Sequence, residues 1–218
     1  MTTQSDWGDF YRERNEDFYE TQAQSSNPLR KWFHSSRQLL VGEYVKKYYQ
    51  EGKHIIDIGC GESLWNTQKI PLVGFDLNIK MLKRGKVLRT LKHGVVGDFT
   101  RIPFKNNSVD VILMTEVLEH IIDYKKTIQG VHQALKPGGI FITTVPYDTA
   151  LSLWKPFFSV QCFIQGRLKG DEYYKKKCGH VNHFSPASIR KELMAGGFRV
   201  IQQFHNRFFT IFTIVQKV

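Results

Sequence analysis

Short apolar runs separated by segments of helical periodicity are the feature that most constrains the fold of this chain. The runs predict five strands, at residues 54–58, 71–75, 94–97, 109–115 and 139–145. Strands that alternate with helices in this way are typical of a parallel sheet with helices on both faces. We therefore predict an α/β fold with a Rossmann-like, doubly wound sheet.

Two further apolar runs close the chain, at residues 198–204 and 207–216, and only His205 and Asn206 separate them. A connection of two residues permits a hairpin and is too short for a parallel crossover. The complete prediction is a seven-stranded sheet, in which five parallel strands are followed by a C-terminal antiparallel hairpin.

Apolar spacing and end signals place the helices. One helix is expected at residues 29–50, after the capping pair Asn27 and Pro28, a second at 124–135, and a third from Pro186 to Gly196. Only fourteen residues separate Gly61 from Asp76. The helix after the first strand is therefore expected to be short.

The chain has 218 residues, 41% of them hydrophobic, which is enough for one domain with a substantial core. Residues 1–27 are polar with scattered aromatics and predict a mobile N-terminal arm. Residues 28–218 form the expected domain, and its aromatic-rich segment at about 147–184 lacks a clear period. A segment that long is more often a functional cap than a plain connection.

Nothing in the sequence predicts a membrane span or a secretory leader. No apolar run approaches the ~18 residues that a spanning helix needs, and the first residues lack a basic start followed by an apolar stretch. Three cysteines without framework spacing, Cys60, Cys162 and Cys178, indicate reduced thiols. We expect a cytoplasmic protein.

The formal charge of +11 favours anionic partners. Basic residues gather at 80–92 and again at 167–177. Such runs are usually solvated faces, and they also suit phosphate, an anionic lipid surface or nucleic acid. The sequence contains no recognised RNA-binding signature.

The stretch HIIDIGCGES at 54–63 is the strongest local signal of a ligand. Gly59 and Gly61 allow a tight turn and a close approach to the backbone at the carboxyl edge of the sheet, although a turn without a ligand is the alternative. A dinucleotide site would have a third small residue at Leu64 and a pyrophosphate on the helix N-terminus, where Glu62 is expected. A carboxylate there disfavours NAD and suits a cationic ligand without phosphate, such as S-adenosylmethionine.

Several motifs together resemble the class I S-adenosylmethionine-dependent methyltransferases, in particular their small-molecule branch of type 11/23. They are DIGCG at 57–61, VDVILMTEVLEH at 109–120, LKPGG at 135–139, HVNHFSP at 180–186 and NPLRKWFH at 27–34. The resemblance covers roughly residues 27–205. Ser63 departs from it, since the family often has a third glycine there.

The resemblance implies S-adenosylmethionine as co-substrate, S-adenosylhomocysteine as product and a set of cofactor-binding residues. Asp57 would hold the methionine ammonium, Asp76 the ribose hydroxyls and Asp98 the adenine amino group. For Asp76 and Asp98 a helix cap is the alternative role. The full set is Asp57, Gly59, Cys60, Gly61, Asp76, Leu77, Asp98, Phe99, Thr115, Glu116 and Val117.

Three histidines are candidate catalytic residues, because an imidazole can accept a proton from the acceptor near neutral pH. They are His120, His180 and His183. For His120 a structural role is the alternative. A metal site of Cys178, His180 and His183 lacks a fourth clustered ligand, so no metal is predicted.

The acceptor is expected to be a small or lipid-like molecule, methylated on oxygen or nitrogen. Aromatic residues interleaved with basic ones in the cap would suit an apolar acceptor that bears a negative group, met at the surface of a membrane. A nucleic-acid methyltransferase, or a noncatalytic basic nucleic-acid-binding protein, is the alternative.

Overall fold

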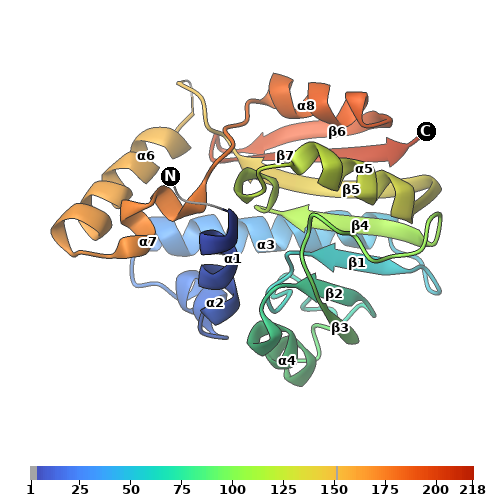
Figure 1. Ribbon diagram of the computed structural model, residues 1–218, viewed down its shortest axis with the longest axis horizontal. Coiled ribbons are helices and arrows are strands. Elements are labelled where there is room, and N and C mark those ends of the chain that lie inside the picture. Colours follow the sequence, from blue (N-terminus) through green and yellow to red (C-terminus); the bar gives the residue numbers. More distant parts are fainter. Residues whose placement is uncertain (1–3, 151) are drawn as a thin grey trace.

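One seven-stranded sheet organises the chain in the computed structural model, which describes residues 4–150 and 152–218. The strand order is β3-β2-β1-β4-β5-β7-β6 (Figure 1). The strands are β1 (Ile55–Ile58), β2 (Val73–Asp76), β3 (His93–Val96), β4 (Val109–Thr115), β5 (Leu135–Pro146), β6 (Phe198–Asn206) and β7 (Thr210–Lys217).

The directions of the strands confirm the predicted fold class. Strands β1 to β5 pair in parallel, while β7 pairs antiparallel with both β5 and β6. The carboxyl ends of the five parallel strands therefore meet at one edge of the sheet. In an open α/β sheet this edge is where ligands bind.

Two apolar layers sandwich the sheet, one on each face. In β4, Ile112 and Met114 belong to one layer, and Val111 and Leu113 to the other, as the alternation of side chains along a strand requires. The first layer takes in helices α5 (Tyr124–Ala134) and α8 (Pro186–Ala195). The second takes in α3 (Pro28–Tyr48) and α4 (Ile79–Val87).

The start of α3 lies where the sequence predicts it. The side chain of Asn27 accepts hydrogen bonds from the amides of Leu29 and Arg30, and Pro28 is the first helical residue. At α8, Ser185 and Ser188 form a reciprocal capping box. These caps fix helix ends that the sequence signals directly.

The short helix expected after β1 is absent, because residues 59–72 form successive turns. The side chain of Asn66 satisfies backbone groups that a helix would otherwise pair, since it bonds to both the amide and the carbonyl of Ile70 and to the carbonyl of Thr90. The expectation that Glu62 lies at a helix N-terminus is therefore wrong.

Two strand boundaries also differ from the prediction. Strand β5 begins at Leu135 rather than at 139. Its pairing with β4 shifts in register between Val109 and Val111, which accommodates the extra residues at its start. The hairpin turn lies at 207–209 rather than at 205–206, with Arg207 and Phe208 at positive φ. A bulge in β6 between Val200 and Gln202 accompanies this longer hairpin.

Helices fill both segments that the sequence marks as arm and cap. The expected mobile arm contains α1 (Gln4–Glu13) and α2 (Phe18–Ala23), and the cap contains α6 (Trp154–Gln161), a π-helix at Cys162–Leu168, α7 (Glu172–Lys175) and a 3-10 turn at Lys177–Gly179. In Figure 1, α1, α2, α6 and α7 gather beyond the end of the sheet at which β4 terminates. No helix in the described ranges is long and apolar enough to cross a bilayer.

Candidate active site

The turn after β1 depends on its two glycines. Gly59 has a φ of +67°, and a Cβ added there would lie 2.4 Å from a methyl carbon of Val117. Gly61 has a φ of +51°, and a Cβ there would lie 2.9 Å from the ring of Tyr19. Positive φ and the lack of space together exclude a larger residue at both positions.

Two buried aspartates fix this turn by accepting hydrogen bonds from it. Asp57 accepts hydrogen bonds of 2.7 Å from both the Ser63 hydroxyl and the Trp65 indole N–H. Asp76 accepts from the backbone amides of Gly61 and Asn78, each at 2.8 Å. Burial raises the pKa of Asp57 to about 6 against the effect of its two donors, and burial also raises the pKa of Asp76. Asn78, not Asp76, caps α4.

Three small cavities with shared lining residues lie at the carboxyl edge of the sheet. A cavity of about 50 Å³ is lined by the predicted cofactor residues Gly59, Asp76, Leu77, Phe99, Glu116 and Val117. A second, of about 70 Å³, is lined by residues that include Gly59, Cys60, Glu62, Ser63, Thr115 and Glu116. The third, of about 120 Å³, lies beneath the cap among aromatic side chains. Tyr19 and Glu116 line all three, so these two side chains partition one cleft.

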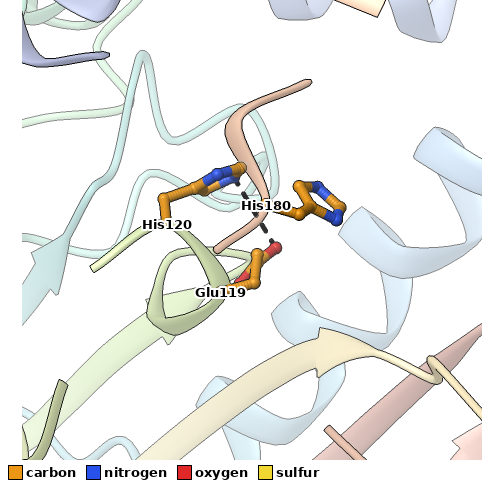
Figure 2. Close-up of side chains that lie close together, drawn as sticks. All are labelled: Glu119, His120 and His180. Atoms are coloured by element: carbon orange, nitrogen blue, oxygen red, sulfur yellow. Dashed lines mark ion pairs between the residues drawn. The ribbon is translucent and has the colours of Figure 1, made fainter. Parts of the chain in front are cut away.

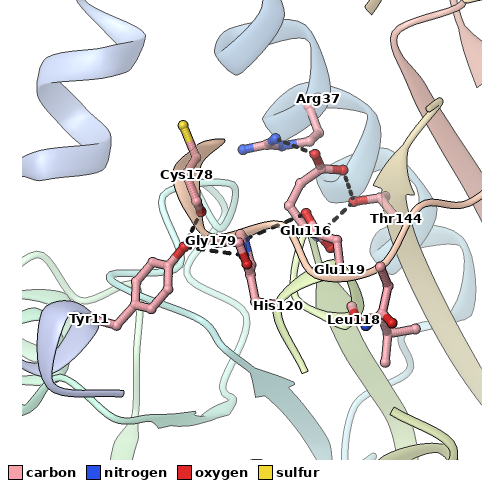
Figure 3. Close-up of polar contacts among 10 residues, drawn as sticks. Tyr11, Arg37, Glu116, Leu118, Glu119, His120, Thr144, Cys178 and Gly179 are labelled. Carbon is pink, nitrogen blue, oxygen red and sulfur yellow. Dashed lines mark hydrogen bonds and ion pairs between the residues drawn. The ribbon is translucent and has the colours of Figure 1, made fainter. Parts of the chain in front are cut away.

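Glu116 occupies the centre of this cleft, just past the end of β4. One carboxylate oxygen lies 3.3 Å from a guanidinium nitrogen of Arg37, and the other accepts a 2.9 Å hydrogen bond from the Thr144 hydroxyl. Figure 3 shows Arg37 and Thr144 on two sides of the carboxylate. Burial raises the pKa of Glu116, although Arg37 and Thr144 oppose the shift.

Glu62 is a second buried carboxylate of the cleft, and in the described part of the chain neither of its oxygens receives a hydrogen bond. Burial raises its pKa to about 7. A buried carboxylate without a partner is costly, and a cationic ligand would remove that cost.

Two of the three predicted catalytic histidines reach the cleft. His120 and His180 line the 120 Å³ cavity, and their ring centroids are 4.9 Å apart. Burial lowers the pKa of His120 to about 4 and that of His180 well below its usual range. The side chain of His183 is 61% exposed and pairs with Asp148 outside this cavity.

Three of the predicted cofactor residues, Asp57, Gly61 and Asp98, line none of the three cavities. Gly61 is part of the turn, and Asp57 supports the turn by its bonds to Ser63 and Trp65. Asp98 is exposed and accepts a hydrogen bond from the Thr100 amide in a turn. No helix follows it within the described residues before β4, so the helix-cap role that the sequence left open does not apply to Asp98. The alternative metal set of Cys178, His180 and His183 also does not converge among the described residues.

Among the cleft residues that sequence reasoning did not assign to the site, three lie at its centre or beside the histidines. Tyr19 and Arg37 come from α2 and α3, far from the strand ends in sequence. The aromatic content of the arm was the only sequence signal for Tyr19, and there was none for Arg37. Glu119 lies inside the motif at 109–120 but was not singled out. Its side chain lies at the 120 Å³ cavity beside His120.

Known proteins share this architecture. A family described as a methyltransferase domain matches residues 30–203. The demethylmenaquinone methyltransferase of Staphylococcus epidermidis is 27% identical over 138 residues, which cover 59% of this chain and 57% of the relative. An uncharacterized protein of Methanocaldococcus jannaschii is 32% identical over 156 residues, which cover 71% of this chain and 57% of the relative. This chain thus matches somewhat more than half the length of these curated relatives.

Among solved structures, the magnesium protoporphyrin IX methyltransferase of Synechocystis with bound S-adenosylhomocysteine has the same fold. The TM-score is 0.71, and the match covers 99% of this chain and all of that one (100%). The sequence identity is 17%, so this likeness concerns the fold.

Proposed function

The chain belongs to the methyltransferase-domain family, and from this premise we propose that it transfers the methyl group of S-adenosylmethionine to a small-molecule acceptor. The observation that carries the proposal is the divided cleft. Its two sheet-side cavities are lined by eight of the eleven predicted cofactor residues, while the cavity beneath the cap offers an aromatic compartment. Glu116 lies between the two parts.

The charge of the cleft supports a cationic cofactor. The oxygens of Glu62 are buried and receive no hydrogen bond from the described residues, and the ammonium or sulfonium of S-adenosylmethionine would provide an opposite charge. Leu77 and Phe99 provide apolar walls for an adenine, and Asp76 lies beside them for the ribose. In this proposal Asp57 acts on the methionine end through the turn that it supports, and Asp98 contacts the adenine from the rim.

Methyl transfer is a displacement at carbon, in which the acceptor forms a bond to the methyl group as the bond to sulfur breaks. The electron pair of that bond returns to sulfur, and the positive charge is lost. Alignment of the reactants in a dry cleft supplies most of the acceleration. His120 and His180 lie in the acceptor cavity and remain neutral near pH 7, so either imidazole can accept a proton from an O–H or N–H group.

Two features, one in α3 and one in the cap, support an apolar acceptor with a negative group. Arg30 and Arg37 line the aromatic cavity. On the outside of the cap, large apolar side chains are exposed, namely Leu153, Val160, Phe163, Ile164 and Leu168. Together with the basic residues at 167–177 they suit contact with an anionic membrane surface, from which a lipid-like acceptor could enter.

Calorimetry tests the proposal. We expect S-adenosylmethionine and S-adenosylhomocysteine to bind with one equivalent, NAD not to bind, and Asp76→Ala to abolish binding while the circular dichroism spectrum is retained. Binding of NAD alone would contradict the proposal. High affinity for RNA that falls steeply with salt, without affinity for either nucleoside, would favour the noncatalytic nucleic-acid binder.

A further inference from the structure

The side-chain oxygens of Glu119 are buried at the acceptor cavity. Glu119 belongs to the 3-10 turn Leu118–His120, and its side chain is 2% exposed. Neither oxygen has a hydrogen-bond partner in the described part of the chain. Glu116, one turn earlier, has both Arg37 and Thr144. Of these two carboxyl groups, only that of Glu116 accepts a side-chain hydrogen bond among the described residues.

Two imidazoles face this carboxylate. One ligand atom each from Glu119, His120 and His180 lies within 4.8 Å of the other two. Figure 2 shows the three side chains close together, Glu119 and His120 from the turn after β4 and His180 from the last part of the cap. Residues 60 positions apart in sequence thus meet at one point of the cavity.

Hydrogen bonding prepares His120 to act as a ligand. Its Nδ1 lies 3.2 Å from the carbonyl oxygen of Gly179, which can only accept, so Nδ1 carries the proton. The lone pair is then on Nε2, which lies 3.8 Å from Glu119 Oε1 and 3.4 Å from the Tyr11 hydroxyl. Histidines that ligate metals usually donate their other N–H to a carbonyl or carboxylate in this manner.

Aromatic stacking restrains the orientation of His180. Its ring is nearly parallel to those of Trp154 and Phe158, at centroid distances of 5.3 and 5.1 Å. A ring held on one face by two aromatic groups loses little freedom when its edge binds a ligand. The site is therefore partly organised before any ion arrives.

We propose that Glu119, His120 and His180 bind a divalent d-block metal ion, with Zn²⁺ as the reference ion. Two imidazoles and one carboxylate form the ligand set of many catalytic zinc and nonhaem iron sites, whereas Mg²⁺ and Ca²⁺ prefer oxygen ligands. Ligand atoms at about 2.1 Å from an ion are about 3 to 3.5 Å apart. The cluster reaches this size by contracting about 1 Å, which small side-chain rotations can provide.

Three protein ligands leave coordination positions open, and these face the acceptor cavity. This consequence rests on the proposed function. An acceptor hydroxyl bound there would lose its proton to solvent more readily, because the ion stabilises the oxyanion. The oxygen would then attack the methyl carbon while the electron pair of the S–C bond passes to sulfur. With the ion bound, the two imidazoles are ligands and no longer proton acceptors, and the metal site favours an oxygen acceptor over a nitrogen acceptor.

Metal binding to the full chain, treated with chelator and free of any affinity tag, tests the site without reference to methyl transfer. We expect calorimetry with Zn²⁺ to give one equivalent, and Co²⁺ to produce visible absorption that Zn²⁺ abolishes. Glu119→Gln and His180→Ala should each weaken Zn²⁺ binding at least about 100-fold, since loss of an outer partner alone costs 10–100-fold. His183→Ala is the matched control and should bind as the wild type does.

Wild-type protein that binds no Zn²⁺, or that binds it equally after Glu119→Gln and His180→Ala, would overturn the proposal. If Glu119→Gln does not fold, His180→Ala and His120→Gln provide the same comparison. Calorimetry with S-adenosylmethionine on the metal-free protein separates the metal site from the proposed methyl transfer. The protein can bind S-adenosylmethionine without binding Zn²⁺, and it can bind Zn²⁺ without binding S-adenosylmethionine.

Discussion

Arg37, on the helix that precedes the sheet, forms an ion pair with Glu116 at the carboxyl end of β4, and both side chains are only 13% exposed. This contact joins two segments that are far apart in sequence at the centre of the cleft. It also affects the charge there, because burial raises the pKa of Glu116 and Arg37 opposes that shift. The position of α3 therefore affects the ionisation of Glu116.

Replacement of Arg37 by methionine should destabilise the protein in a pH-dependent way. Removing one partner of a buried pair leaves an uncompensated charge, and we expect a loss of about 3 kcal/mol in the free energy of unfolding at pH 8. At pH 5 the loss should be smaller, because Glu116 can bind a proton once Arg37 is absent. Urea denaturation at both pH values measures this, and Glu116→Gln added to Arg37→Met should recover most of the loss at pH 8.

Replacement of Gly59 by alanine should cost more than the same change at Gly52. Both residues have positive φ, +67° and +84°, but a Cβ at Gly52 meets nothing within 4 Å, while one at Gly59 collides with Val117. Gly52→Ala should cost about 1 kcal/mol for its backbone conformation. Gly59→Ala should cost roughly 2 kcal/mol more from overpacking and should abolish S-adenosylmethionine binding. Equal losses of stability in the two variants would show that the turn can relax.

Asp76 and Asp98 should differ in their importance for the cofactor. Asp76 positions the glycine turn through the Gly61 amide, whereas Asp98 is exposed and bonds to the Thr100 amide. We expect Asp76→Asn to weaken S-adenosylmethionine binding at least about tenfold, and Asp98→Asn to weaken it less than about threefold, as for a solvent-exposed hydrogen bond. Calorimetry of the two variants measures their affinity for S-adenosylmethionine. Similar losses of affinity in both would indicate that Asp98 contacts the adenine directly.

Local patterns were sufficient to predict most of the fold. Asn27 with Pro28 and Ser185 with Pro186 signal helix starts by capping chemistry, and the apolar runs follow from burial on both faces of the sheet. The missing helix after β1 could not be predicted, because it depends on Asn66 bonding to Thr90, a partner 24 positions away. Such tertiary hydrogen bonds override local propensity.

The candidate site, like the fold, could be predicted only in part. Residues that follow strand ends, such as Asp76 and Val117, could be placed from topology alone, because the carboxyl ends of parallel strands share one edge. Tyr19, Arg37 and the meeting of Glu119 with His180 depend on how the arm and cap fold over that edge. No periodicity in the sequence encodes those contacts.

Glu62 should make the folded state less stable as the pH rises. Its folded pKa of about 7 exceeds the value of 4.5 expected when the chain unfolds. Between these values the folded state holds a proton that the unfolded state has lost, so the free energy of unfolding falls with rising pH. Glu62→Gln should therefore be more stable than the wild type at pH 8, by up to about 3 kcal/mol, and nearly equal to it at pH 4.5. Glu51→Gln, at an exposed position, is the control in denaturation experiments.

The same carboxyl group should release protons when S-adenosylmethionine binds. A cation close to Glu62 favours the ionised carboxylate, so the pKa of Glu62 falls on binding from its value of about 7 in the free protein. At pH 7 up to about half a proton should leave per molecule bound, and the affinity should rise between pH 6 and pH 8. Calorimetry in two buffers with different heats of ionisation counts these protons. Glu62→Gln should release none from this position, and an unchanged count in that variant would place the cationic group of the cofactor beside another carboxylate.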